Sequence, residues 1–464
     1  MASVNSMRWD SCECEEFIVE TGAVEKLERG YLSVKQKGSL NPVARRLIWT
    51  RALRSVGQGA MVVDLALYLK DLRWSAVSIG SVTTAAGLVG AVLILAVGVM
   101  SDRFGRKRFL LSYEVLTTGA ALAASLTTHA YVLVIAIVVA GFGRGQSGAA
   151  GPFSPAEQAW LARYVERDRR GMVFSLNNAV GFFGMAFGAL VGGWPTVAAT
   201  NSPLLAYRPV FWMVAVLSVA SAVIIAGTHE GAAEPVAPMV PLTLASAGGK
   251  TDEVNAHEDQ IRHQENTAIL KLALVNTLNG LAVGLTGPLM GYWFSVRYGV
   301  GTAAVGATIS LSFLMTGLTS VLNGFMARRF GMVKSVTWMR VAGSLMMLAL
   351  PFMPNFGVAS ALYIVRSAAN RGTQGNRSAL SASLTRDTRR GFATSINALS
   401  MRLPSSVGPT VTGYLMNMGL MATPLVLTAG LQLINAGLYQ WVFGKYDRIN
   451  PVSREKPSES TSSR

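Results

Sequence analysis

The sequence predicts an all-α membrane protein of twelve transmembrane helices in two six-helix bundles, on the strength of three observations. Apolar residues make up 51% of the 464 residues and charged residues only 14%, whereas about 25% of a typical soluble domain is charged. The apolar residues form twelve runs of the length that spans a bilayer. Two short motifs recur, in the same order, in each half of the chain.

Each run is expected to be a helix, because a span surrounded by lipid must satisfy its own backbone hydrogen bonds. Close helix packing is expected where small residues recur at every fourth position, as at Gly184, Gly188 and Gly192. The predicted spans lie near 46–69, 77–100, 108–128, 130–151, 171–194, 208–227, 268–293, 302–325, 333–353, 357–380, 391–416 and 421–443.

Lysine and arginine predict the orientation. Five basic blocks fall on one side of the spans, whereas the other side holds only Lys70, Arg73, Arg208 and Arg297. Because basic loops stay in the cytoplasm, both termini are expected to be cytoplasmic. The expected setting is the bacterial inner (plasma) membrane. The same clustering accounts for the net charge of +16, and nucleic-acid binding is not expected because no basic stripe is interleaved with aromatic residues.

A polar segment of mixed charge, with three prolines, separates the sixth and seventh spans and predicts a cytoplasmic linker with room for one surface helix. The residues before the first span lack the apolar core of a secretory signal peptide. The expected units are an N-terminal extension (1–45), a first bundle (46–227), the linker (228–266), a second bundle (267–444) and a cytoplasmic tail (445–464).

The two cysteines, Cys12 and Cys14, both precede the first span. A Cys-x-Cys pair could bind a metal, but no further Cys or His completes a set of ligands, so reduced thiols are expected. The chain also lacks the Gly-x-x-x-x-Gly-Lys-[Ser/Thr] loop that binds nucleotide phosphates, which removes ATP-driven pumping. We therefore expect no metal, no cofactor and no enzymatic activity.

The repeated motifs indicate two halves of common design. The sequence Asp-Arg-Phe-Gly at 102–105 returns as Arg-Arg-Phe-Gly 226 residues later. The pattern Arg-Arg-Gly, three residues, Ser-x-Asn begins at Arg169 and returns at Arg389, 220 residues later. Two matches in the same order at nearly equal spacing favour an internal repeat.

The segment 98–108, Gly-Val-Met-Ser-Asp-Arg-Phe-Gly-Arg-Lys-Arg, resembles the loop between the second and third helices of the major facilitator superfamily. The resemblance implies two six-helix bundles around a central cavity that opens to each side of the membrane in turn. It also implies a conformational latch, because an acidic group and arginines can hydrogen-bond neighbouring helix ends. The latch residues are Gly98, Asp102, Arg103, Gly105 and Arg106.

Two further patterns match that family only in part. Arg144-Gly-Gln-Ser-Gly148 resembles its Arg-x-x-Gln-Gly motif, in which the arginine is associated with proton coupling, although the glutamine stands one place early. The fifth span keeps Gly192-Gly193 of the drug-proton antiporter pattern but has Gly184-Met185 where Gly-Pro is expected. The chain is thus most similar to the drug-proton antiporter branch, and export does not follow from this similarity.

Ionisable groups inside spans are candidates for function, because lipid penalises them. No histidine lies within a span, and from 268 to 443 the only acid is Asp387, in a loop. The proton-coupling candidates are therefore Asp64, Glu114 and Arg144. Asp64 could instead pair with Lys70 or Arg73, and Glu114 could pair with the nearby basic loop. Glu157 could cap a helix or act in gating.

The expected substrate cavity is rich in arginine. Arg144, Arg366 and Arg402 fall near the bilayer midplane, whereas Arg371 and Arg377 are close enough to the cytoplasmic face to reach water. Such a midplane favours an anionic or strongly polar substrate, unless acids or carbonyls neutralise the arginines. The predicted cavity residues are Gln58, Asn276, Asn279, Arg366 and Arg402.

Together these features predict a secondary active transporter that moves a small, polar or anionic solute by alternating access, coupled to protons. Multidrug efflux by proton antiport is the first alternative, although a lipophilic cation would favour acids that these spans scarcely contain. The second is a transporter-like receptor or scaffold, for which a latch would have no use. Expected partners are the solute, protons and membrane lipid, with no requirement for an oligomer.

Overall fold

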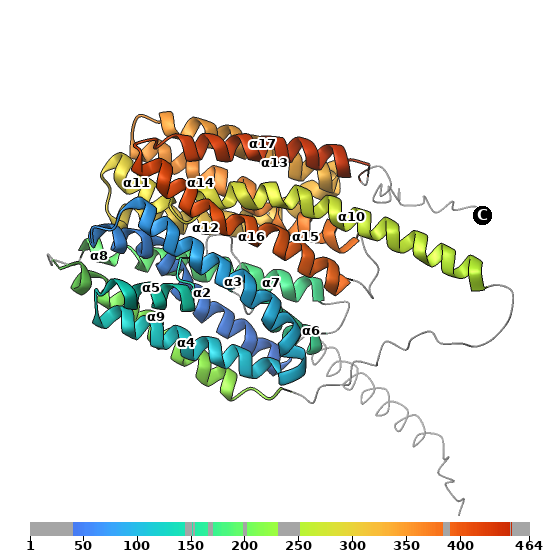
Figure 1. Cartoon of the computed structure of the whole chain (residues 1–464), viewed down its shortest axis with the longest axis horizontal. Coiled ribbons are helices and arrows are strands. Elements are labelled where there is room, and N and C mark those ends of the chain that lie inside the picture. The colour runs from blue at the N-terminus through green and yellow to red at the C-terminus, as the bar shows by residue number, and fades with distance from the viewer. Residues whose placement is uncertain are drawn as a thin grey trace, which may run out of the picture.

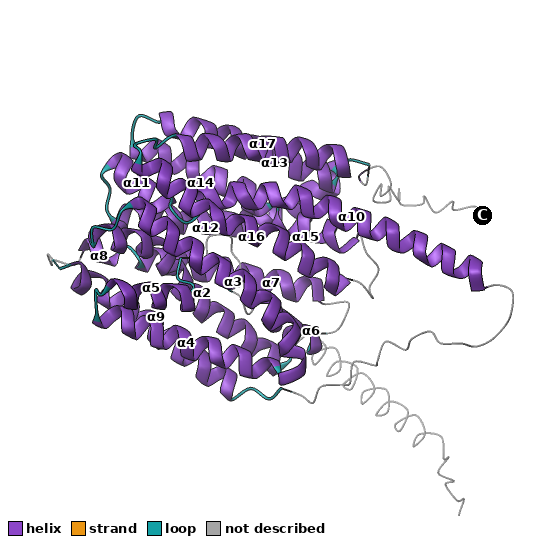
Figure 2. Cartoon of the chain, in the orientation of Figure 1, coloured by secondary structure: helices purple, strands orange, loops and turns teal. Residues whose placement is uncertain are grey.

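The structure is a computed structural model, and it describes residues 40–143, 151, 154–165, 170–197, 202–230, 251–383, 390–445 and 447. Within these ranges every regular element is helical (Figure 2). The first half contains α2 (Pro42–Asp71), α3 (Ala76–Phe104), α4 (Arg106–Leu126), α5 (Ala130–Ala140), α6 (Ser154–Arg163), α7 (Arg170–Val191), α8 (Trp194–Val197) and α9 (Pro203–Ala226).

The second half contains α10 (Thr251–Thr286), α11 (Met290–Tyr298), α12 (Thr302–Phe330), α13 (Met332–Ala349), the 3-10 turn η3 (Leu350–Phe352), α14 (Phe356–Gly372), α15 (Gln374–Ser383), α16 (Arg390–Asn417) and α17 (Thr423–Phe443). Each of the twelve predicted runs is occupied by helix, as far as the described residues extend. The predicted run 268–293 holds α10 and α11, and the run 357–380 holds α14 and α15.

Seven of the described segments are both long and apolar enough to cross a membrane on that basis alone. The remaining predicted spans are short or carry polar residues that face the protein interior. α2 buries Arg54 and Asp64, and α17 buries Gln432 and Asn435. Polar groups that pack inside a bundle lower the hydropathy of a helix without exposing charge to lipid.

Local sequence accounts for several helix boundaries. Asn41 accepts a hydrogen bond from the Val43 amide at the start of α2, and Asn355 does the same for Val358 at the start of α14. The α3–α4 and α12–α13 junctions each turn at one glycine, Gly105 with φ 91° and Gly331 with φ 97°. The repeat seen in the sequence therefore has the same backbone turn in both halves.

The helices form two groups that lie side by side (Figure 1). α2, α4, α7 and α9 pack together in the first, and α10, α13, α16 and α17 in the second. Contact between the groups runs mainly through α3 with α16 and through α7 with α12. We call the end where α2 begins and α17 ends the terminal end, and the opposite end the distal end.

The two bundles touch closely at the distal end. A Cβ atom on Gly306, near the start of α12, would lie 2.6 Å from the Ala189 carbonyl oxygen of α7. A Cβ on Gly80 of α3 would collide with the Pro409 carbonyl of α16. On the same side, the Thr410 hydroxyl lies 2.7 Å from the Thr84 hydroxyl. Glycine thus permits backbone contact between bundles at this end.

Candidate functional site

A cavity of about 260 Å³ lies between the bundles. α3 contributes Thr83, Gly87 and Ala91 to its wall, and the second bundle contributes residues of α10, α15 and α16. The α3–α16 contact between the Thr84 and Thr410 hydroxyl groups lies beside this cavity, next to the lining residues Thr83 and Pro409. We call it the central cavity.

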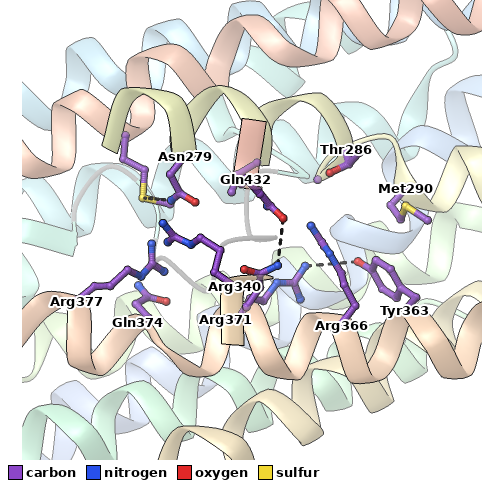
Figure 3. A pocket seen from close by; sticks show the side chains of 14 residues that line it. Asn279, Thr286, Met290, Arg340, Tyr363, Arg366, Arg371, Gln374, Arg377 and Gln432 are labelled. Atoms are coloured by element: carbon purple, nitrogen blue, oxygen red, sulfur yellow. Dashed lines mark hydrogen bonds between the residues drawn. The ribbon is translucent and has the colours of Figure 1, made fainter. Parts of the chain in front are cut away.

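A smaller cavity of about 60 Å³ lies inside the second bundle and shares Gln374, Arg377 and Met401 with the wall of the central cavity. Four arginines line it, and we call it the arginine pocket. They are Arg340 from α13, Arg366 and Arg371 from α14, and Arg377 from α15. Figure 3 shows the four side chains converging from the helices around the pocket.

The hydrogen bonds in the pocket satisfy these arginines only in part. Arg340 donates to the Asn435 side-chain oxygen, and Arg371 donates to the Tyr363 hydroxyl at 3.5 Å (Figure 3). Each of the four guanidinium groups keeps one buried nitrogen for which the described residues supply no hydrogen-bond partner. No carboxylate stands among the described residues that line the pocket. The pocket is therefore strongly positive and partly unsatisfied.

Four of the five predicted cavity residues lie in these two connected spaces. Asn276 and Arg402 line the central cavity, and Asn279 and Arg366 line the arginine pocket. Asn276 donates to the Asn397 side chain across α10 and α16. Gln58 instead lines a separate cavity of about 30 Å³ inside the first bundle. Its depth along α2 suggested the shared space, but depth does not determine which face of a helix a residue occupies.

Asp64 is fully buried in α2, and neither carboxylate oxygen has a hydrogen-bond partner among the described residues. Neither Lys70 nor Arg73, the alternative partners, hydrogen-bonds to Asp64 in the described structure, and the Lys70 ammonium donates to the Ser295 hydroxyl at 2.7 Å. A buried carboxyl group without a partner favours its neutral form. Arg144, the other predicted coupling residue of the first half, lies outside the described residues.

Glu114 is engaged in a buried ion-pair network instead of the basic loop. Its carboxylate accepts from Arg54 Nε at 2.9 Å and from the Ser221 hydroxyl at 2.8 Å. Glu157, in the first turn of α6, accepts from Arg54 Nη1 at 2.5 Å. Both acids thus contact Arg54 within the first bundle, where Arg51 is buried as well, and they are not available to the arginine pocket.

The predicted latch segment closes α3 and opens α4. The carboxylate of Glu230, which follows α9, accepts from the backbone amides of Arg106 at 2.7 Å and Lys107 at 3.0 Å. The Arg106 guanidinium donates to the Ala159 carbonyl at 2.9 Å. Gly98 lies in α3, and the side chains of Asp102 and Arg103 lie outside the part of the chain that is described.

The second bundle repeats this arrangement with different residues. Asp447, after α17, accepts from the amides of Val333 and Lys334 at the start of α13, both at 2.9 Å. In both halves an acid from beyond the sixth helix caps the third, as expected for a helix N-terminus with unpaired amides. Neither cap was predicted from the sequence, because Glu230 and Asp447 lie in polar segments that carry no recognisable motif.

Three arginines of the pocket were missed or discounted from sequence. Arg340 was not considered, although an arginine eight residues into the run 333–353 is the usual sign of a buried functional charge. Arg371 and Arg377 were expected to reach water along the helix. The structure turns both toward the pocket, because α14 breaks at Thr373 and α15 continues along its wall.

Comparisons with known proteins agree with this architecture. The family model of the Major Facilitator Superfamily matches residues 47–245 and 272–463. An uncharacterized membrane protein of Saccharomyces cerevisiae is 21% identical over 346 residues, which cover 69% of this chain and 75% of the yeast protein. The multidrug resistance protein MdtH of Klebsiella pneumoniae is 27% identical over 148 residues, 32% of this chain and 31% of MdtH.

A solved structure has the same fold. A bacterial homologue of the human lysosomal transporter Spinster, in an inward-facing and unoccupied conformation, superposes with a TM-score of 0.67 at 15% identity. The superposition covers 90% of this chain and all of the other. The family match spans most of the chain and both bundles. The chain therefore belongs to the major facilitator superfamily, and it is an integral membrane transporter, not an enzyme.

Proposed function

We propose that this protein is a secondary active transporter that moves a small polar or anionic solute by alternating access and couples that movement to protons. One observation carries the proposal. Four arginines line a pocket that adjoins the central cavity, and each keeps a buried nitrogen without a partner. A bound oxyanion would accept hydrogen bonds from these guanidinium groups and balance their charge.

The energetics support an anion over a cation. A guanidinium at the membrane centre costs about 2.5–3.5 kcal/mol on insertion scales, and several close together also repel one another. The described residues that line the pocket include no acid to offset this. An anionic solute would neutralise the arginines and accept bidentate hydrogen bonds from their planar donors. A cation would meet repulsion from the same groups.

The arrangement of the bundles supports alternating access. Backbone contacts close the distal end, at Gly80 with Pro409 and at Gly306 with Ala189. The basic blocks favour a cytoplasmic location for the opposite, terminal end. With both termini cytoplasmic, the central cavity belongs to an inward-facing state. In this proposal 46–227 and 267–444 are the moving units, and 228–266 is their linker. The location in a bacterial inner membrane stays a prediction, because the relatives come from both yeast and bacteria.

Asp64 is the proposed proton carrier. Its carboxylate is buried on α2 without a hydrogen-bond partner among the described residues, in the bundle opposite the arginine pocket. Glu114 is a weaker candidate than the sequence suggested, because Arg54 and Ser221 already hold its carboxylate. Protonation of Asp64 would remove a buried negative charge for which the described part of the chain provides no hydrogen-bond partner.

Counterflow in proteoliposomes tests the proposal. Uptake of a radiolabelled anion would be compared with that of a neutral and a cationic solute of similar size. We expect the anion to be favoured, and Arg366→Gln or Arg402→Gln to weaken anionic solutes more than neutral ones. Arg329→Gln is the control, because Arg329 is exposed and lines neither cavity. Equal effects on all three solutes would show that the arginines are structural.

Multidrug efflux is the second candidate. The observation in its favour is the similarity to MdtH, whose name records multidrug resistance, together with apolar residues such as Val283 and Met401 in the central cavity. Export of a lipophilic cation that competes with the anion would support efflux. Absence of binding by such cations would leave the anion proposal alone.

A further inference from the structure

We infer that the arginine pocket binds the compact, doubly charged tetrahedral head of an organic phosphate or phosphonate, while the central cavity holds the remainder of the molecule. This inference rests on the proposed function and narrows its substrate class. It is carried by the number and directions of the arginines, the size of the pocket, and its junction with the central cavity.

The charge of the pocket favours a dianion. Arg340, Arg366, Arg371 and Arg377 surround one small space, and no ion-pair partner for any of them is found among the described residues. A monocarboxylate would balance one of these charges, whereas a phosphate monoester balances about 1.5 to 2 near neutral pH. The unsatisfied charge that remains after binding is therefore smaller with a phosphate.

The directions of the donors favour a tetrahedral group. The arginines reach the pocket from three elements, α13, α14 and α15 (Figure 3). A carboxylate presents two oxygens in one plane, which suits one or two guanidinium forks. A phosphate presents three terminal oxygens in different directions. Arginines of each of the three helices could then donate to a different oxygen.

Neutral donors add to this set. The Tyr363 hydroxyl accepts a hydrogen bond from Arg371, so its own hydrogen stays available for an oxyanion. Tyr363 and Thr286 both line the pocket, and their hydroxyl groups stand on different helices (Figure 3). Asn370 and Gln432 bond each other at 3.2 Å and help to fix the wall between α14 and α17. The pocket thus combines charged and neutral donors.

The volumes of the arginine pocket and the central cavity suit different parts of the proposed ligand. The pocket measures about 60 Å³, less than a quarter of the volume of the central cavity. The smaller space suits the compact head group and the larger one suits the rest of the molecule. The central cavity is about 260 Å³ and shares Arg377, Gln374 and Met401 with the pocket. A molecule with its head among the arginines would therefore extend into the larger space.

A series of ligands with one ring and different heads tests the inference. Binding of phenyl phosphate, phenylphosphonate, benzenesulfonate, benzoate and phenol to the purified full-length protein would be measured by calorimetry. We expect phenyl phosphate and phenylphosphonate to bind about tenfold or more tightly than benzoate or benzenesulfonate. The preference should shrink below about pH 6, where phosphate monoesters take up their second proton.

Variants connect the preference to the pocket. Arg366→Gln and Arg371→Gln should lower phenyl phosphate affinity about tenfold and benzoate affinity by much less. Arg366→Lys keeps the charge but loses the fork and should lie between. Arg329→Gln is the matched control with wild-type affinities. Inorganic phosphate should compete with phenyl phosphate, because it carries the head alone.

The outcomes separate this inference from the proposed function. If benzoate and phenyl phosphate bind equally well and both depend on Arg366, the anionic transporter stands and the dianionic head is wrong. If phenol binds best and neither arginine variant changes its affinity, both proposals are wrong. If benzenesulfonate matches phenyl phosphate, tetrahedral shape and not the second charge is being recognised, and the inference of a dianion is overturned.

Discussion

Substitution of Gly306 by alanine should open the distal end of the transporter. In the structure a Cβ at this position would lie 2.6 Å from the Ala189 carbonyl oxygen, whereas ordinary contact begins at 3.4 Å. α7 and α12 must therefore part by about 0.8 Å, and this contact joins the two bundles. Overpacking of this kind typically costs about 1–3 kcal/mol.

That energy acts on one conformation only. If the distal contact exists in the inward-facing state and is broken in the outward-facing state, the alanine penalises the first and spares the second. A difference of about 1–3 kcal/mol changes the ratio of the two states about 5- to 150-fold. The change should therefore be visible as a population shift and not as a loss of folding.

Spin-label distances measure this shift directly. Cys12 and Cys14 are the only cysteines, and changing both to serine leaves a background for labels at Tyr131→Cys and Met418→Cys, two exposed distal positions in opposite bundles. Gly306→Ala should move the distribution toward longer distances. Gly437→Ala is the matched control, because nothing lies within 4 Å of its Cβ. A distribution in Gly306→Ala identical to that of the control would refute the reasoning.

Three other changes test separate parts of the mechanism. Asp64→Asn should abolish accumulation driven by a pH gradient while sparing counterflow, since solute exchange needs no net proton movement; survival of uphill transport would place the carrier elsewhere. Asp102→Asn should slow transport in proteoliposomes with insertion intact, and a wild-type rate would remove the latch. Glu230→Ala should lower the melting temperature, since an N-terminal cap contributes about 0.5–2 kcal/mol. Asp447→Ala is the corresponding change in the second bundle, and an unchanged melting temperature in both variants would show that the caps are dispensable.

The fold could be predicted from the sequence because lipid restricts the choices. A run such as 302–325 has only one stable backbone form in a membrane, and α12 spans it with a few residues to spare at its end. The repeat of Phe-Gly at Gly105 and Gly331 predicted two halves of common design, and both glycines adopt positive φ. Breaks inside spans, as at Thr373, carried no comparable signal and were not predicted.

The candidate site was only partly predictable, because helix depth follows from counting residues but helix face does not. In the structure Arg366 and Asn279 line the arginine pocket, whereas Gln58 at a similar depth lines a cavity inside its own bundle. The ion-pair partners of the buried residues were harder still to predict from the sequence. Nothing near Arg54 in the sequence indicates that Glu114 and Glu157, 60 and 103 residues away, would converge on it.

These pairings divide the buried charges between the bundles. In the part of the first bundle that the structure describes, Arg54 pairs with Glu114 and Glu157, and Asp64 has no partner. The second holds the four arginines of its pocket without a described acid beside them. A proton arriving at Asp64 and an anion arriving at the pocket would each reduce charge in a different bundle. Coupling between the two sites would then pass through the contacts that join the bundles, at α3 with α16 and at α7 with α12. Asp64→Asn therefore tests the proposed proton site, and Gly306→Ala tests one of the contacts that would connect it to the anion site.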